Sequence, residues 1–387
     1  MSEKRFVYAD NAATTAPRKE AIEEMMPYLT ENWGNPSSIH SKGEAAKAAL
    51  ADYRERIAKV LGCDASEIVF TSCGTEADNH AIRGAAYANS RKGKHIVTTK
   101  VEHPAVLNTC RALEKEGFRV TYLDVDGKGR VSPEKVYAAI CEDTILVSVM
   151  YANNEIGTVM PVREIADVCH KRGVLFMTDA VQAVGALPIN VSELGVDMLT
   201  ASGHKIGAPK GIGLLYIKKG TKIKNLIEGG GQEKSRRGGT ENLPYIAAFA
   251  KALELAYAEM NDNSRIVKMR ERLIDELLKI PRSRLNGSRT ERLPGNANIS
   301  FECIEGESIL LLMDMAGICC STGSACSSNS LDPSHVLLAI GLPHEVAHGS
   351  VRITLSHNNT EEDVDYIIEK LTAIVARLRA MSPLWNE

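Results

Sequence analysis

The sequence predicts an α/β protein built on a mainly parallel sheet. Short apolar segments alternate with helical segments between residues 68 and 201, beginning with Ile68–Ser72 and Thr75–Asn89. From about Leu243 this alternation stops, and long helices with isolated short strands follow. Strands that alternate with helices form parallel sheets covered on both faces. We therefore predict a large sheet domain and a smaller α+β domain.

Residues 1–16 are expected to be extended or irregular. A helix is expected over Pro17–Leu29, because proline is favoured in the first helical turn, and a second helix over Lys42–Leu61, which is rich in Ala, Lys, Glu and Arg. The strands expected in the large domain are 68–72, 95–99, 120–123, 145–149, 175–178, 198–201 and 212–217, with helices at 75–89, 105–115, 133–140 and 162–171. These segments predict a seven-stranded sheet flanked by helices.

The change of rhythm near residue 243 predicts the domain boundary. Helices are expected at 243–260, 265–278, 307–315 and 361–381, and strands at 296–301 and 350–355. We assign residues 16–260 to the large domain and residues 1–15 and 261–387 to the small α+β domain, which carries the loop around Cys326.

Composition excludes several classes of function. The chain has 387 residues, 44% of them hydrophobic, and a formal net charge of -3, as in ordinary soluble globular proteins. No basic patch suited to nucleic acid is present. Residues 1–17 lack an apolar signal core and no apolar run reaches spanning length, so a cytoplasmic location without a membrane partner is expected. Nine cysteines are an odd number, and a disulfide framework is not expected.

Polar and small residues follow the predicted strands at their carboxyl ends, where ligands of such sheets bind. The loop after strand 198–201 contains Lys205 beside His204. The other groups, in chain order, are Cys73-Gly74-Thr75-Glu76, Glu102-His103, Asn153-Asn154 and Asp179-Ala180-Val181-Gln182. One edge of the sheet therefore offers a helix start, an imidazole, an amide, a carboxylate and an amine.

These groups match the needs of pyridoxal 5'-phosphate. A desolvated lysine amine can form a Schiff base with its aldehyde. Helix N-terminal N–H groups and a hydroxyl suit its phosphate, and a carboxylate keeps its pyridine nitrogen protonated. Taken singly, each residue is typical of a helix cap or a turn. Their occurrence at consecutive strand ends favours the cofactor.

The sequence resembles the NifS/IscS-type cysteine desulfurases, which belong to the class V aminotransferase-like enzymes of PLP fold type I. The resemblance spans nearly the whole chain. The segments that carry it are Tyr8–Thr15, Gly34–Ser38, Thr75–Asn79, Glu102-His103, Asn153–Gly157, Asp179–Gln182, Ser202–Lys205, Arg236–Asn242 and Ser321–Cys326.

The resemblance implies roles for individual residues around the cofactor. Lys205 would bind the aldehyde and later move the substrate α-proton. Asp179 would pair with the pyridinium, and His103 would stack on the ring and act as acid and base. Gln182 and Asn154 would bond the ring hydroxyl. The groups that would hold the phosphate are Gly74, Thr75, Ser202 and His204, with Thr240 reaching the phosphate of a neighbouring subunit in a homodimer.

The substrate and its sulfur are assigned in the same way. Arg352 would clamp the carboxylate of L-cysteine with its bidentate guanidinium, and Asn154 and Asn35 would lie near the substrate. Cys326 would accept the substrate sulfur as a persulfide, release L-alanine, and pass the sulfur to an acceptor such as an iron–sulfur scaffold. The small, polar residues around Cys326 predict a mobile, exposed loop.

Other functions stay open from the sequence alone. Cys319, Cys320 and Cys326 could bind a metal, but they lack a C-x-x-C pair and a nearby histidine, so no metal site is predicted. A selenocysteine lyase, a class V aminotransferase and a binding protein without cofactor remain alternatives. A phosphate-loop nucleotide site is excluded, because Lys210-Gly211 is not followed by Ser or Thr. The sulfur acceptor and the pathway are not encoded in a recognisable motif.

Overall fold

The computed structural model describes residues 5–260, 263–322 and 333–385. Its centre is a seven-stranded sheet in the order β2-β8-β7-β6-β5-β3-β4. The strands are β2 (Ile68–Thr71), β3 (His95–Thr99), β4 (Arg119–Leu123), β5 (Thr144–Ser148), β6 (Leu175–Asp179), β7 (Met198–Ser202) and β8 (Gly213–Ile217). Only β8 runs opposite to its neighbours β2 and β7, so the predicted mainly parallel α/β sheet is confirmed.

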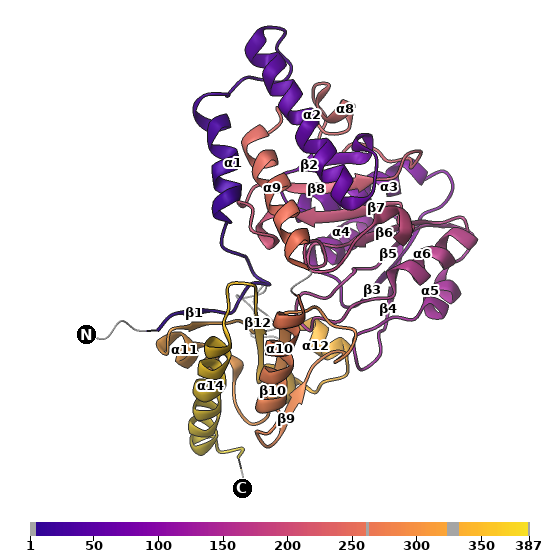
Figure 1. Cartoon of the computed structure of the whole chain (residues 1–387). Helices are drawn as coiled ribbons and strands as arrows, with labels where there is room; N and C mark the ends of the chain where they lie inside the picture. Colours follow the sequence, from indigo (N-terminus) through magenta and orange to yellow (C-terminus); the bar gives the residue numbers. More distant parts are fainter. Residues whose placement is uncertain (1–4, 261–262, 323–332, 386–387) are drawn as a thin grey trace.

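Helices cover both faces of this sheet (Figure 1). On one face, Ile96 and Leu146 pack against α3 (Gly74–Asn89) and α4 (Pro104–Lys115). On the other face, Val97 and Val147 belong to a larger core. The helices of that core are α1 (Lys19–Thr30), α2 (Ser41–Leu61), α5 (Pro133–Ala139), α6 (Val162–Lys171), α7 (Val191–Leu194) and α9 (Leu243–Glu259). Successive strand residues alternate between the two cores, as the pleat requires.

A second core lies below the large sheet in Figure 1. Its three-stranded sheet has the order β12-β10-β9, with β9 (Ser283–Leu285), β10 (Asn296–Phe301) and β12 (Ser350–Thr354). It packs against α10 (Asn263–Leu277), α11 (Gly306–Met315) and α14 (Glu361–Met381). A division into domains at about residue 260 remains our proposal. The short helices α12 (His335–Ala339) and α13 (His344–His348) contribute residues to the core of the large sheet instead.

The N-terminal segment is extended in part, as expected, but its strand pairing was not predicted. Val7–Tyr8 forms strand β1, which pairs in parallel with β11 (Ile318–Cys319). A two-residue strand has no periodicity to detect, and its partner is about 310 positions away. The short helix α8 (Gln232–Ser235) comes between β8 and α9 in the chain.

The expected start of the first helix at Pro17 is also wrong, since α1 begins at Lys19. Thr15 and Arg18 donate their backbone N–H groups to the carbonyls of His204 and Gly207 at 2.9 and 2.8 Å. These bonds hold residues 15–18 extended along the 204–207 loop, so the helix starts only after them. No helix in the part of the chain that the structure describes is long and apolar enough to cross a membrane.

Candidate active site

Lys205 lies in a single 3-10 turn, Gly203–Lys205, directly after β7. Its Nζ donates to the carbonyl oxygens of Ala12 and Ala13, both at 2.7 Å. Gln182 Nε2 donates to the same Ala12 oxygen at 2.9 Å. The N-terminal segment therefore positions the amine at the carboxyl edge of the large sheet.

Asp179 ends β6 beside this turn and is buried. One carboxylate oxygen accepts the backbone N–H of Val181 at 2.9 Å. Burial raises the pKa of Asp179, while His103 and Lys205 act in the opposite direction. Burial lowers the pKa of His103, and Lys205 lowers it further whereas Asp179 raises it. The three predicted catalytic and cofactor groups therefore form one electrostatic cluster.

His103 stands at the start of α4, where its Nδ1 accepts the backbone N–H of Ala105 at 3.1 Å. This bond occupies Nδ1 and leaves Nε2 as the second ring nitrogen. His103 lines a cavity of about 340 Å³ together with Thr75, Asn79 and Asn108. The cavity opens between the N-termini of α3 and α4, where backbone N–H groups favour an anion.

Gly74 is the first residue of α3, and the structure explains why it lacks a side chain. A Cβ there would lie 2.8 Å from Val181 Cγ2 and 3.4 Å from Ser202 Cβ. Ser202 itself is buried at the end of β7. Gly74, Thr75 and Ser202 thus converge on a close-packed cradle, and their donors fit a phosphate group.

Arg352 lies in β12 and is 2% exposed. One terminal nitrogen donates to Asp10 Oδ1 at 2.9 Å and the other to the carbonyl of Asn154 at 3.0 Å. Its Nε is among the buried polar atoms of the described residues that have no hydrogen-bond partner. A buried donor without a partner is costly, and a substrate carboxylate would satisfy it.

Replacing Arg352 with lysine should raise KM for L-cysteine about tenfold to a hundredfold, with a smaller change in kcat. Lysine keeps the charge but loses Nε and the planar fork, and a charge-assisted hydrogen bond contributes about 1.5–3 kcal/mol. Steady-state kinetics measure the effect. Arg292→Lys is the matched control, because Arg292 is also buried but binds only backbone and side-chain oxygens of residues 286–296. An unchanged KM in Arg352→Lys would contradict the assignment.

Of the other assigned residues, His204 adjoins this cluster, whereas Asn35 and Thr240 stand apart from it. His204 Nδ1 lies 3.1 Å from Thr14 Oγ1, and burial with nearby Lys205 lowers its pKa to about 4. Asn35 and Thr240 are both exposed. Asn35 lies in the connection between α1 and α2, where its side chain accepts the N–H of Ser37 at 2.9 Å. Cys326 lies outside the described residues.

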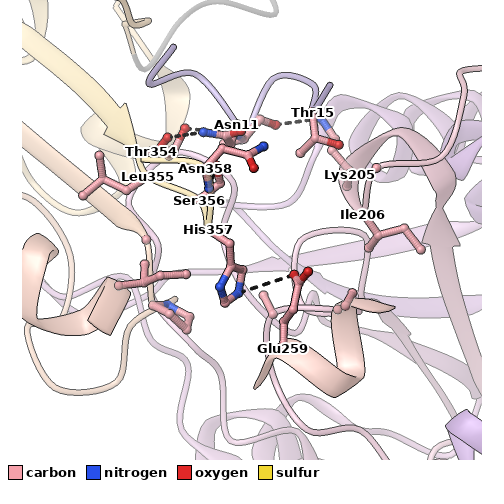
Figure 2. Close-up of a pocket in the computed structure, with 18 of the residues that line it drawn as sticks. Asn11, Thr15, Lys205, Ile206, Glu259, Thr354, Leu355, Ser356, His357 and Asn358 are labelled. Carbon is pink, nitrogen blue, oxygen red and sulfur yellow. Dashed lines mark hydrogen bonds and ion pairs between the residues drawn. The ribbon is translucent and has the colours of Figure 1, made fainter. Parts of the chain in front are cut away.

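A second cavity of about 430 Å³ adjoins Lys205 (Figure 2). It lies between the N-terminal segment, α9 and the end of β12, and is lined by Asn11, Thr354 and His357. Glu259 lies at its lower side in the figure. One carboxylate oxygen pairs with the Arg18 guanidinium at 2.6 Å, and the other lies 3.9 Å from His357 Nε2. His103, Asp179 and Thr75 do not line it. We therefore place the chemistry at the strand ends and not in this cavity.

Sequence reasoning assigned no role to several buried carboxyl groups near the cluster, although it named the segments that contain them. Glu102 accepts the Thr99 hydroxyl at 2.7 Å and the Met150 N–H at 3.0 Å, and burial raises its pKa to about 8. Asp78 accepts the Thr200 hydroxyl at 2.7 Å, and burial also raises its pKa. Asp10, the partner of Arg352, belongs to the Tyr8–Thr15 segment. The sequence identified that segment by its resemblance to the family. The role of Asp10 becomes visible only from its ion pair with Arg352.

Glu155 gives a test of buried charge. It accepts the Ser334 hydroxyl, and burial raises its pKa from 4.5 to about 7. Between these values the folded chain keeps a proton that the unfolded chain has released. The contribution of Glu155 to the free energy of unfolding should therefore fall by about 3 kcal/mol as pH rises through this window. Glu155→Gln should lack this part of the fall. Denaturant unfolding across the window measures it, and parallel curves for the two proteins would contradict it.

Comparison with known proteins agrees with this site. The family model described as aminotransferase class-V matches residues 7–367. The cysteine desulfurase IscS of Methanosarcina thermophila is 55% identical over 99% of this chain and 95% of its own length. That of Dictyoglomus turgidum is 53% identical over 99% and 98%.

Solved structures show the same relationship. A NifS-like protein superposes with a TM-score of 0.91 at 39% identity, covering 97% of this chain and all of its own. SspA in complex with cysteine gives 0.81 at 36% identity, covering 90% and 98%. The fold and the recognition made from the sequence are thereby confirmed. This chain belongs to the aminotransferase class-V family and is one of its cysteine desulfurases.

Proposed function

We propose that the chain uses pyridoxal 5'-phosphate to convert L-cysteine to L-alanine and transfers the sulfur to Cys326. The observation that carries the proposal is the grouping of Lys205, Asp179 and His103 at one sheet edge, next to the Gly74 cradle. An amine, a buried carboxylate, an imidazole and an anion cradle are the donors that this cofactor requires.

The residues present fit the cofactor. Gly74, Thr75 and Ser202 would hold its phosphate, Lys205 its aldehyde and Asp179 its ring nitrogen. When bound, it supplies an electron sink for bonds at the substrate α- and β-carbons. Gln182 and His204 contact the N-terminal segment, and we propose that they and Asn154 also face the cofactor.

Arg352 would bind and orient the substrate carboxylate through its partnerless Nε. Lys205 would take the proton from Cα, and His103 would take the proton from the substrate thiol. The amine follows β7 and the imidazole follows β3, and β6 with Asp179 lies between these strands in the sheet, so both proton carriers would flank one substrate.

The transfer step balances without an external oxidant. The Cys326 thiolate attacks the substrate sulfur and forms an S–S bond. The Cβ–S bond breaks, its electron pair stays on the carbon side, and Cβ takes up a proton. One cysteine and one enzyme thiol therefore give one alanine and one enzyme persulfide. The persulfide would then pass its sulfur to an acceptor protein such as an iron–sulfur scaffold.

A homodimer is part of the proposal. Thr240 is exposed in the single chain. Three residues earlier, the guanidinium of Arg237 pairs with Glu76 of α3 at 2.8 Å. Glu76 is next to Thr75, so the 237–240 segment starts at the phosphate cradle. We propose that Thr240 completes the cradle of a second copy and that Asn35 approaches the substrate. The cytoplasmic location remains a prediction.

The test is a single-turnover reaction of the purified holoenzyme with L-cysteine. We expect alanine and enzyme-bound sulfur in equal amounts, with intact mass showing the gain of one sulfur atom. Alanine without any protein-bound sulfur would contradict the transfer to a thiol. Pyruvate or a transaminated keto acid in place of alanine would favour an aminotransferase. Faster turnover of selenocysteine than of cysteine would favour a selenocysteine lyase.

A further inference from the structure

Three metal-ligating side chains meet at the opposite edge of the large sheet. His95 is the first residue of β3, while Cys141 and Asp143 form the turn that leads into β5. They are the only group of this kind among the residues that the structure describes. Lys205 and Asp179 lie at the carboxyl ends of the strands, whereas this cluster lies at the amino ends. It therefore takes no part in the chemistry above.

The distances within the cluster are short. Cys141 Sγ lies 3.1 Å from His95 Nδ1 and 3.2 Å from Asp143 Oδ1, and all three ligand atoms lie within 4.8 Å of one another. A tetrahedral Zn²⁺ with bonds of about 2.0–2.3 Å separates its ligand atoms by roughly 3.3–3.8 Å. A metal ion could therefore enter with small shifts of the two exposed side chains.

The imidazole is held at both ring nitrogens, and a metal would have to replace the contact of Nδ1 with the Thr144 hydroxyl at 2.8 Å. His95 is completely buried, and its Nε2 lies 2.8 Å from the Thr121 hydroxyl. Hydrogen bonding at the far ring nitrogen is the usual way in which a protein fixes a metal-binding histidine. The backbone is fixed too, since His95 N–H donates to the Asp143 carbonyl at 3.1 Å and Cys141 N–H to the Thr144 hydroxyl at 2.8 Å.

The guanidinium of Arg119 already lies against two of the three ligand side chains. A terminal nitrogen of Arg119 donates to Cys141 Sγ at 3.2 Å and to Asp143 Oδ1 at 2.8 Å. The Arg119 side chain is 55% exposed, so it can turn into solvent when a metal enters. The cluster thus attracts positive charge, and Arg119 is the competitor that a metal must displace.

We propose that His95, Cys141 and Asp143 form a binding site for a divalent transition metal of the Zn²⁺ class, with water as the fourth ligand. One thiolate, one imidazole and one carboxylate are the ligand types that Zn²⁺ accepts. The bound ion would join the amino ends of β3 and β5. The ligands are 46 and 48 positions apart in sequence, which is why ligand spacing gave no sign of the site.

The test is metal titration of the holoenzyme. All proteins carry Cys326→Ala, so that the proposed sulfur-carrying thiol cannot bind the ion, and are first stripped with a chelator. Calorimetry with Zn²⁺ should show one site per chain, and Co²⁺ should give the visible bands of a tetrahedral thiolate complex. Cys141→Ser should weaken binding at least tenfold, and Arg119→Gln should tighten it severalfold.

Cys303→Ser is the matched control, because Cys303 also lies near an arginine, with Arg282 at 3.8 Å, but belongs to no ligand group of the described residues. Its binding should equal that of the parent. Zn²⁺ should also raise the thermal midpoint of the parent and not that of Cys141→Ser. Equal binding by the parent and Cys141→Ser, weaker binding by Arg119→Gln, or no binding at all would overturn the proposal.

Discussion

Replacing Lys205 with alanine should lower the rate of alanine formation from L-cysteine by on the order of 10³-fold or more. The change removes both the covalent attachment of the cofactor and the proposed carrier of the Cα proton, and a positioned acid or base alone contributes roughly 10²–10⁴-fold. The absorbance of the purified protein should change as well, because the lysine–aldehyde linkage is lost. Single-turnover alanine formation and the spectrum of the bound cofactor measure the two effects.

Lys210→Ala is the matched control for this prediction. Lys210 lies in the same glycine-rich loop and is exposed, whereas the Lys205 amine is held between two carbonyl oxygens. The control should keep both its spectrum and its rate. A Lys205→Ala protein with the parental rate would contradict the assignment. If Lys210→Ala instead lost the spectrum, the attached lysine would be Lys210.

Replacing Cys326 with alanine should abolish the enzyme persulfide. The thiolate is the nucleophile, so a cysteine whose pKa is strongly raised cannot serve in its place. Burial raises the pKa of four described cysteines, Cys63, Cys110, Cys169 and Cys320, to about 12. Peptide mapping after one turnover should find the extra sulfur on Cys326 in the parent and on no cysteine in the variant.

Cys320→Ala provides the comparison, because Cys320 is six residues from Cys326 in the chain and burial raises its pKa to about 12. It should form the persulfide as the parent does. Sulfur found on Cys73 or Cys319 in the Cys326→Ala protein would show that another thiol can accept it. Undiminished transfer in that variant would remove Cys326 from the mechanism.

Much of the large sheet could be predicted because its signals are local. Most of the strands are short, buried and mainly apolar, so their residues alone identify them, and the polar residues that follow the parallel strands meet at one edge. The grouping of Asp179, His103 and Lys205 follows from that rule. The starts of α3 and α4 were also close to the prediction, since a cap and a proline mark them.

The remaining contacts could not be predicted because they are not local. Arg352 donates to Asp10, which is 342 positions earlier in the chain. The Lys205 amine donates to carbonyl oxygens 192 and 193 positions earlier. Backbone carbonyls carry no sequence signal. The Glu155–Ser334 bond and the Asp78–Thr200 bond likewise join distant segments. Cys326 was found by resemblance and lies outside the described residues.

The pairing of β1 with β11 has a consequence for the order of synthesis. Val7 and Tyr8 leave the ribosome about 310 residues before their partners Ile318 and Cys319. The large sheet can form earlier, because its strands end at Ile217. The ion pair between Asp10 and Arg352 likewise cannot form before β12 has been made, so the proposed substrate-carboxylate site is completed only after the strands of the large sheet.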